Sequence, residues 1–177
     1  LLGETKEFEF VITEIGGTVG DIEALPYIEA VRQLKWELEN NALFIHLTLV
    51  PYLAAARELK TKPTQHSVKT LLEAGIQPDI LVCRTEHPIN SEIKRKIARF
   101  CNVERDAVIE SMDVSTIYEV PILMQKEGLD KIVLKKLQLN NSKEVKLNKW
   151  EKFLDGLQNP KEQITIGLVG KYVELQD

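Results

Sequence analysis

The most informative part of the chain reads Thr13-Glu14-Ile15-Gly16-Gly17-Thr18-Val19-Gly20-Asp21-Ile22-Glu23. It overlaps the end of the apolar run at residues 8–13, which predicts a buried strand because the run is short and rich in β-branched and aromatic residues. Glu14 then stands at the carboxyl end of this strand, the edge at which open α/β sheets bind ligands. A carboxylate there can hold Mg²⁺ while phosphates fill the metal's other positions. A plain Gly-rich turn with solvated acids is the alternative interpretation.

Outward from this stretch, short apolar runs alternate with amphipathic segments, the order that builds a parallel sheet covered by helices. Further strands are expected at 43–49, 79–83 and 107–110, and helices are expected from Pro26, Thr64 and Ser91 and over 113–126 and 129–139. In the helix from Pro26, one apolar face is expected to hold Tyr27, Val31, Leu34 and Leu38. The pattern predicts an α/β fold of the P-loop-NTPase or Rossmann type, with a mostly parallel sheet, flanking helices and an incomplete set of strands.

The composition is that of a soluble globular protein, with 177 residues, 44% hydrophobic and 28% charged. The 27 acidic residues outnumber the 23 basic ones, and the net charge of -4 disfavours nucleic acid and anionic membranes as partners. No apolar run has the length of a membrane span, and the two cysteines fit a reducing compartment, so a cytoplasmic location is expected. Because the first residue is Leu1 and the pattern opens midway, we expect a piece of a longer protein.

A second chemical cluster reads Lys60-Thr61-Lys62-Pro63-Thr64-Gln65-His66. Pro63 disfavours the α conformation at Lys62, so Lys60 and Lys62 are expected in extended chain with their ammonium groups on one side. Thr64 is expected to cap the next helix, whose free N–H groups favour an anion. Together these features favour a triphosphate, with a solvated lysine-rich turn as the alternative.

Several separate segments now resemble, in order and spacing, the synthetase domain of the CTP synthase family. They are residues 14–23, 46–52, 60–68, 75–81 and 100–103. The ending Ile166-Gly167-Leu168-Val169-Gly170-Lys171-Tyr172 resembles the first strand of that family's glutamine amidotransferase domain. The resemblance divides the chain into part of the synthetase domain (1–139), a linker with a short helix (140–162) and the first strand of the amidotransferase domain (163–177).

The resemblance implies a ligase that phosphorylates the uracil O4 of UTP with ATP and Mg²⁺, and then replaces that phosphate with ammonia from glutamine. It also implies inhibition by the product CTP, and a homotetramer whose UTP sites are shared between subunits. Glu14 is the implied Mg²⁺ ligand, while Lys60 and Lys62 lie near the reacting UTP and no residue is assigned as catalytic. The implied UTP and CTP ligands are Asp21, Ile22, Glu23, Lys60, Thr61, Lys62, Pro63, Thr64, Gln65 and Lys96, and the implied ATP contacts are Met112, Asp113 and Val114.

Some features depart from the pattern. The chain has no G-x-x-x-x-G-K-S/T phosphate loop, and Cys83 and Cys101 lack the glycine-flanked elbow of a glutaminase nucleophile, so both are expected to be core thiols. His46 is expected to be a hydrogen-bonded interior residue. We therefore expect this piece to be inactive by itself. Two alternatives stay open: an ATP-dependent ligase related to dethiobiotin synthetase, and a non-catalytic nucleotide-sensing or assembly module.

Overall fold

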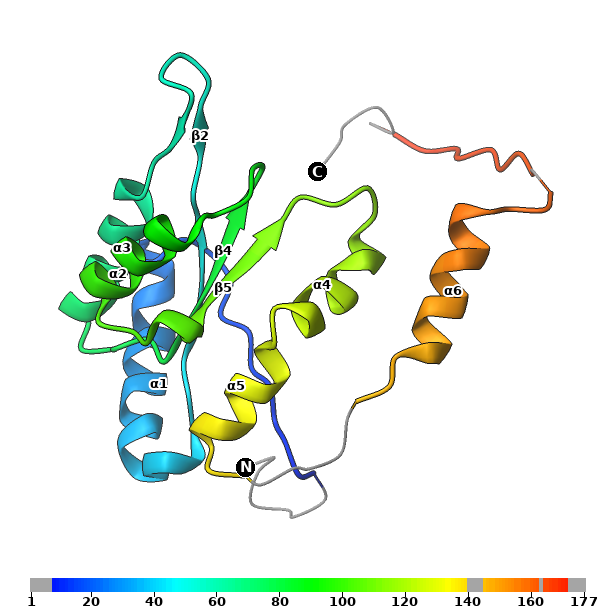
Figure 1. Ribbon diagram of the computed structural model, residues 1–177. Helices are drawn as coiled ribbons and strands as arrows, with labels where there is room; N and C mark the ends of the chain where they lie inside the picture. Colours follow the sequence, from blue (N-terminus) through cyan, green and yellow to red (C-terminus); the bar gives the residue numbers. More distant parts are fainter. Residues whose placement is uncertain (1–7, 140–144, 163, 172–177) are drawn as a thin grey trace. The chain divides into compact units, whose positions relative to one another are not determined.

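A computed structural model describes residues 8–139, 145–162 and 164–171 of the chain (Figure 1). The chain divides into two compact units, Leu1–Lys143 and Glu144–Asp177, which are treated separately below. None of the helices in the described ranges is long and apolar enough to cross a membrane.

The described part of the first unit is built on a parallel sheet. Its strands are β1 (Ile45–Leu49), β4 (Ile80–Thr85) and β5 (Val108–Met112), in the order β1-β4-β5. The register pairs His46 with Leu81, and Val82 with Ile109. The central strand β4 is buried at five of its six positions, as expected for a parallel strand covered on both faces. The expected α/β fold with an incomplete parallel sheet is confirmed.

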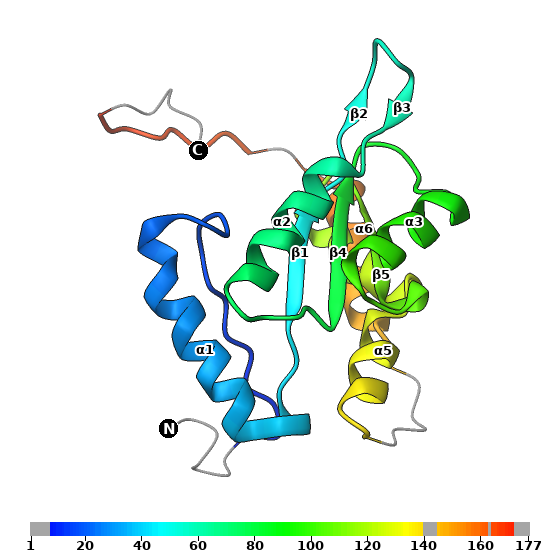
Figure 2. The same cartoon turned by 90° about the vertical axis from the view of Figure 1, so that its left-hand side faces the viewer.

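Helices cover the two faces of the sheet in separate layers (Figures 1 and 2). One face packs against α2 (Lys62–Glu73) and α3 (Ser91–Cys101), and the other packs against α4 (Val120–Lys126) and α5 (Leu129–Lys136). The core of the first layer includes Val68, Leu81, Cys83, Ile97, Cys101 and Val108. Short 3-10 helices lie at η2 (Ile22–Ala24), η3 (Glu39–Asn41), η4 (Arg105–Ala107) and η5 (Ile117–Glu119). The segment expected to be helical from residue 113 therefore turns helical only at η5.

Helix α1 (Leu25–Leu38) packs beside α2, but of the expected apolar face only Val31 packs against the buried cluster there. Ala24 and Ile28 are buried against Leu71 and Ile76, whereas Tyr27 is 65% exposed. Leu34 and Leu38 are also exposed. The apolar residues of α1 lie on more than one side of the helix, so periodicity alone could not identify the buried side.

The strand expected at residues 8–13 does not form, and this prediction is wrong. The segment has no regular secondary structure, and all six residues are exposed, Ile12 at 95%. Strand β1 pairs with β4 on one side, and no described strand pairs with its other edge. On β1 itself Leu47 is 67% exposed, although its neighbour Val82 is covered on the same face. An apolar run becomes a strand only where a neighbour supplies hydrogen bonds and cover, and the segment lacks both.

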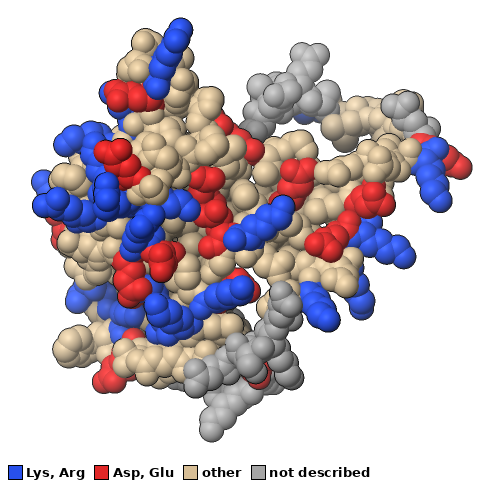
Figure 3. All heavy atoms as spheres, in the orientation of Figure 1, with Lys and Arg blue, Asp and Glu red and all other residues tan. Residues whose placement is uncertain are grey.

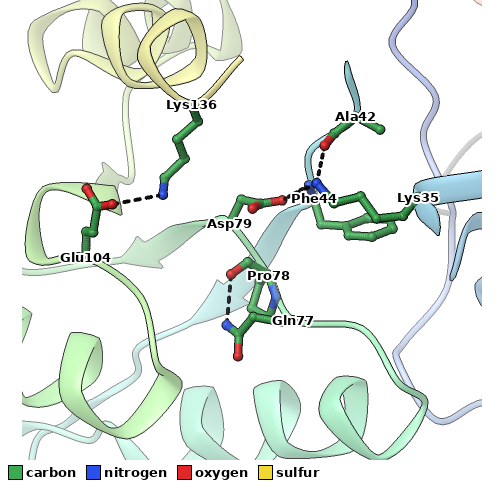
Figure 4. Close-up of polar contacts among 8 residues, drawn as sticks. All are labelled: Lys35, Ala42, Phe44, Gln77, Pro78, Asp79, Glu104 and Lys136. Atoms are coloured by element: carbon green, nitrogen blue, oxygen red, sulfur yellow. Dashed lines mark hydrogen bonds and ion pairs between the residues drawn. The ribbon is translucent and has the colours of Figure 1, made fainter. Parts of the chain in front are cut away.

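One carboxylate fixes the start of the sheet (Figure 4). Asp79 accepts a hydrogen bond from the Phe44 N–H at 2.7 Å and pairs with the Lys35 ammonium at 3.5 Å. The Lys35 ammonium also donates to the Ala42 carbonyl. These contacts join the end of α1 to the segments that lead into β1 and β4.

The second unit contains α6 (Asn148–Gln158), in which Leu154 is buried and the rings of Trp150 and Phe153 lie 5.4 Å apart. The described residues 164–169 carry no strand. Tyr172 and residues 140–144, on which part of the domain division depends, lie outside the described residues. The division into linker and amidotransferase start therefore stays a prediction.

Candidate functional site

The lysine cluster lies at the carboxyl end of β1. After β1 the chain forms a hairpin of β2 (Tyr52–Leu53) and β3 (Glu58–Leu59), which returns it to the sheet (Figure 2). The Lys60 N–H donates to the Pro51 carbonyl at 2.9 Å, and the Thr64 hydroxyl donates to the Leu49 carbonyl at 3.0 Å. These bonds hold residues 60–64 at the sheet edge where parallel α/β proteins bind ligands.

Helix α2 begins at Lys62, one turn earlier than expected, which corrects two predictions. Lys62 is helical rather than extended, and Thr64 lies inside the first turn rather than at the cap. Thr64 is fully buried, and its hydroxyl oxygen also accepts from Thr48 at 3.2 Å. Thr61 is the N-cap residue, but its hydroxyl accepts from the Gln65 side chain at 3.0 Å and does not cap the helix. Since the first turn of a helix has N–H groups without helical partners, this end of α2 favours an anion.

Charged side chains from outside the cluster act on Lys60 or on its partner at this place. The Lys60 ammonium donates to the Glu58 carboxylate. That hydrogen bond, with a smaller contribution from the charge of Lys96, holds the pKa of Glu58 below its usual value. Lys96 therefore lies close enough to act on the same carboxylate, although it comes from α3. Basic side chains gather over α2 and α3 on the face in Figure 3, despite the net charge of -4.

The loop with the expected acidic ligands lies further along α2. Gly20 has a φ of +106°, and a Cβ there would lie 3.2 Å from Thr70 Cγ2. Thr70 is six residues beyond Thr64, about 9 Å along the helix. Asp21 accepts the Thr18 N–H at 3.2 Å, while Ile22 is 83% exposed and Glu23 is also exposed. The structure thus places Lys60 and Lys62 at the start of α2, and the acidic loop further along the same helix.

Glu14 does not make a metal site in this structure. It is exposed, and no group of three or more His, Cys, Asp or Glu side chains in the described ranges is arranged to hold a metal ion. Mg²⁺ usually needs one or two carboxylates and oxygens from a phosphate ligand. Glu14 alone would therefore hold Mg²⁺ only together with the oxygens of a bound phosphate ligand.

The expected ATP contacts follow β5 at the same edge of the sheet. Met112 is the last residue of β5, and Val114 is half-buried. The Asp113 N–H donates to the Thr85 carbonyl at 3.0 Å, and its carboxylate accepts from Arg84 Nε at 2.9 Å. Both proposed nucleotide segments therefore lie at the carboxyl edge of one parallel sheet.

The cysteines are core thiols, as expected. Cys83 and Cys101 are fully buried, and burial raises their pKa values to about 12 and about 11. A nucleophilic cysteine needs a lowered pKa, so neither thiol is suited to that role.

His46 is an interior residue, also as expected. It is buried, and its Nε2 lies 2.8 Å from the Ser67 hydroxyl oxygen on α2. Burial lowers the pKa of His46 below 6.5, so the ring is neutral in the folded protein near neutral pH.

This burial predicts a pH effect on stability. Below the unfolded pKa of 6.5 the unfolded chain binds a proton at His46 that the folded chain does not, so unfolding is favoured as the pH falls. The stability that the protein gains from keeping His46 neutral is fully present above the unfolded pKa and is lost as the pH falls below it. We expect the urea midpoint to fall from about pH 8 to about pH 5, and the fall to be smaller in His46→Gln. If the urea midpoint of His46→Gln fell as much over this pH range as that of the unsubstituted protein, other groups would be responsible for the effect.

Two contacts of the site were not predicted from the sequence: the ion pair of Lys60 with Glu58 and the ring contact of Tyr52 with His87. Glu58 lies two residues before Lys60, so their proximity in extended chain was a usable signal. The ring contact of Tyr52 with His87, with centroids 3.9 Å apart, joins segments distant in sequence and had no such signal.

The fold and the site define a class of protein: a Rossmann-like α/β domain with a basic helix start at the carboxyl edge of its sheet, the arrangement of a nucleotide-binding domain. A family profile described as CTP synthase N-terminus matches residues 2–139. The chain belongs to the CTP synthase family.

Curated relatives agree with this assignment. The chain is 66% identical to CTP synthase of Christiangramia forsetii over 178 residues, 66% identical to that of Flavobacterium johnsoniae, and 61% identical to that of Bacteroides fragilis. Each comparison covers 100% of this chain and 33% of the relative. The chain thus spans about a third of the length of these relatives.

Proposed function

We propose that the full-length protein converts UTP to CTP, using ATP and ammonia released from glutamine. The observation that carries the proposal is the start of α2, where Lys60 and Lys62 lie beside a helix N-terminus at the carboxyl end of β1. Lysines and a helix start both favour the oxygens of a triphosphate. Family membership supports a pyrimidine nucleotide as this ligand, because the curated relatives are named CTP synthase.

In the proposed reaction the uracil O4 of UTP attacks the γ-phosphate of ATP, and ADP leaves. Ammonia then adds to C4, and phosphate leaves as CTP forms. The residues of this chain bind and orient the substrates: residues 60–65 and Lys96 hold the UTP triphosphate, and residues 112–114 contact the adenine of ATP. Mg²⁺ accompanies ATP in the proposal, with Glu14 as one ligand when phosphates supply others. No residue of this chain is assigned to the chemical steps.

The test is CTP formation by the purified full-length protein supplied with UTP, ATP, Mg²⁺ and glutamine. We expect CTP to accumulate only when both nucleotides are present. ATP-dependent ligation of a small organic acid without UTP would instead support the dethiobiotin-synthetase-like alternative. Binding of CTP without turnover would support the sensing module.

The 177-residue chain alone is expected to form no CTP from UTP, ATP and either glutamine or ammonia. It contains no phosphate loop of the G-x-x-x-x-G-K-S/T type, and its two cysteines are buried thiols with raised pKa values. The same assay, run on the 177-residue chain beside the full-length protein, measures this. Turnover with ammonia by the shorter chain would contradict it.

Inhibition by CTP is proposed to use the same phosphate contacts with the base in a different pocket. Asp21, Ile22 and Glu23 are proposed to line that pocket. About 9 Å of helix separates Thr64 from the place where their loop meets α2, a distance that one nucleoside triphosphate can span. The homotetramer with UTP sites shared between subunits is proposed from membership of the family alone. A cytoplasmic location also stays a prediction, based on the two free cysteines.

Glu23→Ala in the full-length protein is expected to raise the CTP concentration needed for inhibition about five- to thirtyfold. The Glu23 carboxylate can accept hydrogen bonds from ribose hydroxyls or the exocyclic amine, and losing one bond costs about 1 to 2 kcal/mol. The UTP requirement should rise less. Initial rates at varied UTP and fixed CTP measure both quantities. Unchanged CTP inhibition with weakened UTP saturation would assign Glu23 to substrate binding alone.

A further inference from the structure

One side chain at the proposed triphosphate site has the same charge as the ligand. Glu58 lies in β3, and its carboxylate accepts a hydrogen bond from the ammonium of Lys60. The charge of Lys96 acts on the same carboxylate from α3. An anion thus already lies beside lysines that are proposed to bind a phosphate.

We propose that Glu58 competes with the triphosphate for Lys60, so that it must move away when UTP or CTP binds. The inference rests on the proposed function of this site. Carboxylate and phosphate oxygens accept hydrogen bonds from the same lysine donors. Because Glu58 is tethered two residues from Lys60, its effective concentration at the ammonium is high, and it competes with every anion that enters.

The exposure of the pair allows this exchange. The Lys60 side chain is 42% exposed and the Glu58 side chain is 55% exposed. Ion pairs this open to water hold their partners weakly, and either side chain can turn away without moving buried residues. A ligand with several negative charges displaces such a carboxylate from Lys60. A ligand without phosphate makes no contact with Lys60, so its binding does not require Glu58 to move. Glu58 therefore lowers the affinity for phosphorylated ligands without affecting the nucleoside.

An alternative role for Glu58 has the opposite sign. If its carboxylate positioned Lys60 for the ligand, removing the charge would weaken UTP binding. The direction of the change in affinity therefore distinguishes competition from positioning.

The test uses equilibrium binding of UTP and of uridine to the full-length protein. Glu58→Gln is expected to tighten UTP binding about threefold and to leave uridine binding unchanged. When Lys60→Ala is already present, Glu58→Gln should not tighten UTP binding, because the ammonium for which Glu58 competes is absent. Glu73→Gln is the matched control: it removes one negative charge from an exposed ion pair with Lys69 at the other end of α2.

Weaker or unchanged UTP binding in Glu58→Gln would overturn the inference, as would an equal gain in Glu73→Gln. If Lys60→Ala weakens UTP binding while Glu58→Gln has no effect, only the role of Glu58 is wrong. If Lys60→Ala has no effect, the proposed phosphate site is wrong. Equal unfolding midpoints for all variants exclude misfolding as the cause of any difference.

Discussion

Replacing Lys60 or Lys62 by alanine in the full-length protein is expected to weaken UTP binding about ten- to a hundredfold. Each substitution removes a charged donor aimed at a triphosphate, and hydrogen bonds to charged groups are worth about 1.5 to 3 kcal/mol. The loss of UTP affinity in Lys60→Ala should lie toward the lower end of this range. In the unsubstituted protein the Lys60 ammonium gives up its pair with Glu58 when it binds the ligand, so its net contribution is smaller. Calorimetric titration with UTP measures both variants.

The matched control is Lys69→Ala on the same helix. Its side chain is 75% exposed and its pair with Glu73 is long at 3.8 Å, so its loss should change UTP affinity little. Uridine supplies a control on the ligand side, because it lacks the phosphates that the lysines contact. A fall in uridine affinity as large as the fall for UTP would exclude a phosphate role for Lys60 and Lys62.

Leu81→Ala is expected to lower the free energy of unfolding by about 2 to 5 kcal/mol, the largest stability effect we predict. Leu81 lies in the central strand β4, is completely buried and packs in the cluster between the sheet and helices α2 and α3. Alanine leaves a cavity there, because the neighbouring side chains belong to fixed elements. Urea unfolding of the 177-residue chain measures the change.

Leu47→Ala is the control for this prediction. The substitution is chemically identical and lies on the neighbouring strand β1, but the Leu47 side chain is 67% exposed. Its cost should stay near about 0.5 kcal/mol or below. Equal losses for both variants would show that burial in the sheet does not govern stability as described.

The parts of the fold that the sequence predicted are those with dense local signals. The apolar run around β4 predicted a strand, and five of the six residues of this strand are buried. Two cysteines in apolar runs were correctly assigned to the core. In each case the identity of neighbouring residues was sufficient.

The predictions that failed depended on distant partners. Residues 8–13 have a strand composition, but a strand needs a neighbour, and composition does not supply one. The start of α2 moved to Lys62 because the Thr64 hydroxyl bonds to Leu49, fifteen residues earlier, and so turns inward rather than capping the helix. Lys96, which only the family resemblance implied, acts on Glu58 from α3, and its role in nucleotide binding stays a prediction.

The candidate site was predictable in its chemistry but not in its assembly. The lysines at 60 and 62 and the helix that follows indicated an anion from sequence alone. The carboxylate of Glu58, the ion pair of Arg84 with Asp113, and the distance of the acidic loop from the lysines emerged only from the structure. All three depend on residues that are distant in sequence or on side-chain conformation, which local patterns do not encode.

The most direct measurement of the central claim is an experimental structure of the full-length protein with UTP bound. We expect the triphosphate at the start of α2, with its oxygens within hydrogen-bond distance of the Lys60 and Lys62 ammonium groups and with Glu58 turned away from Lys60. A triphosphate bound at another place, with Lys60 still paired to Glu58, would contradict this account.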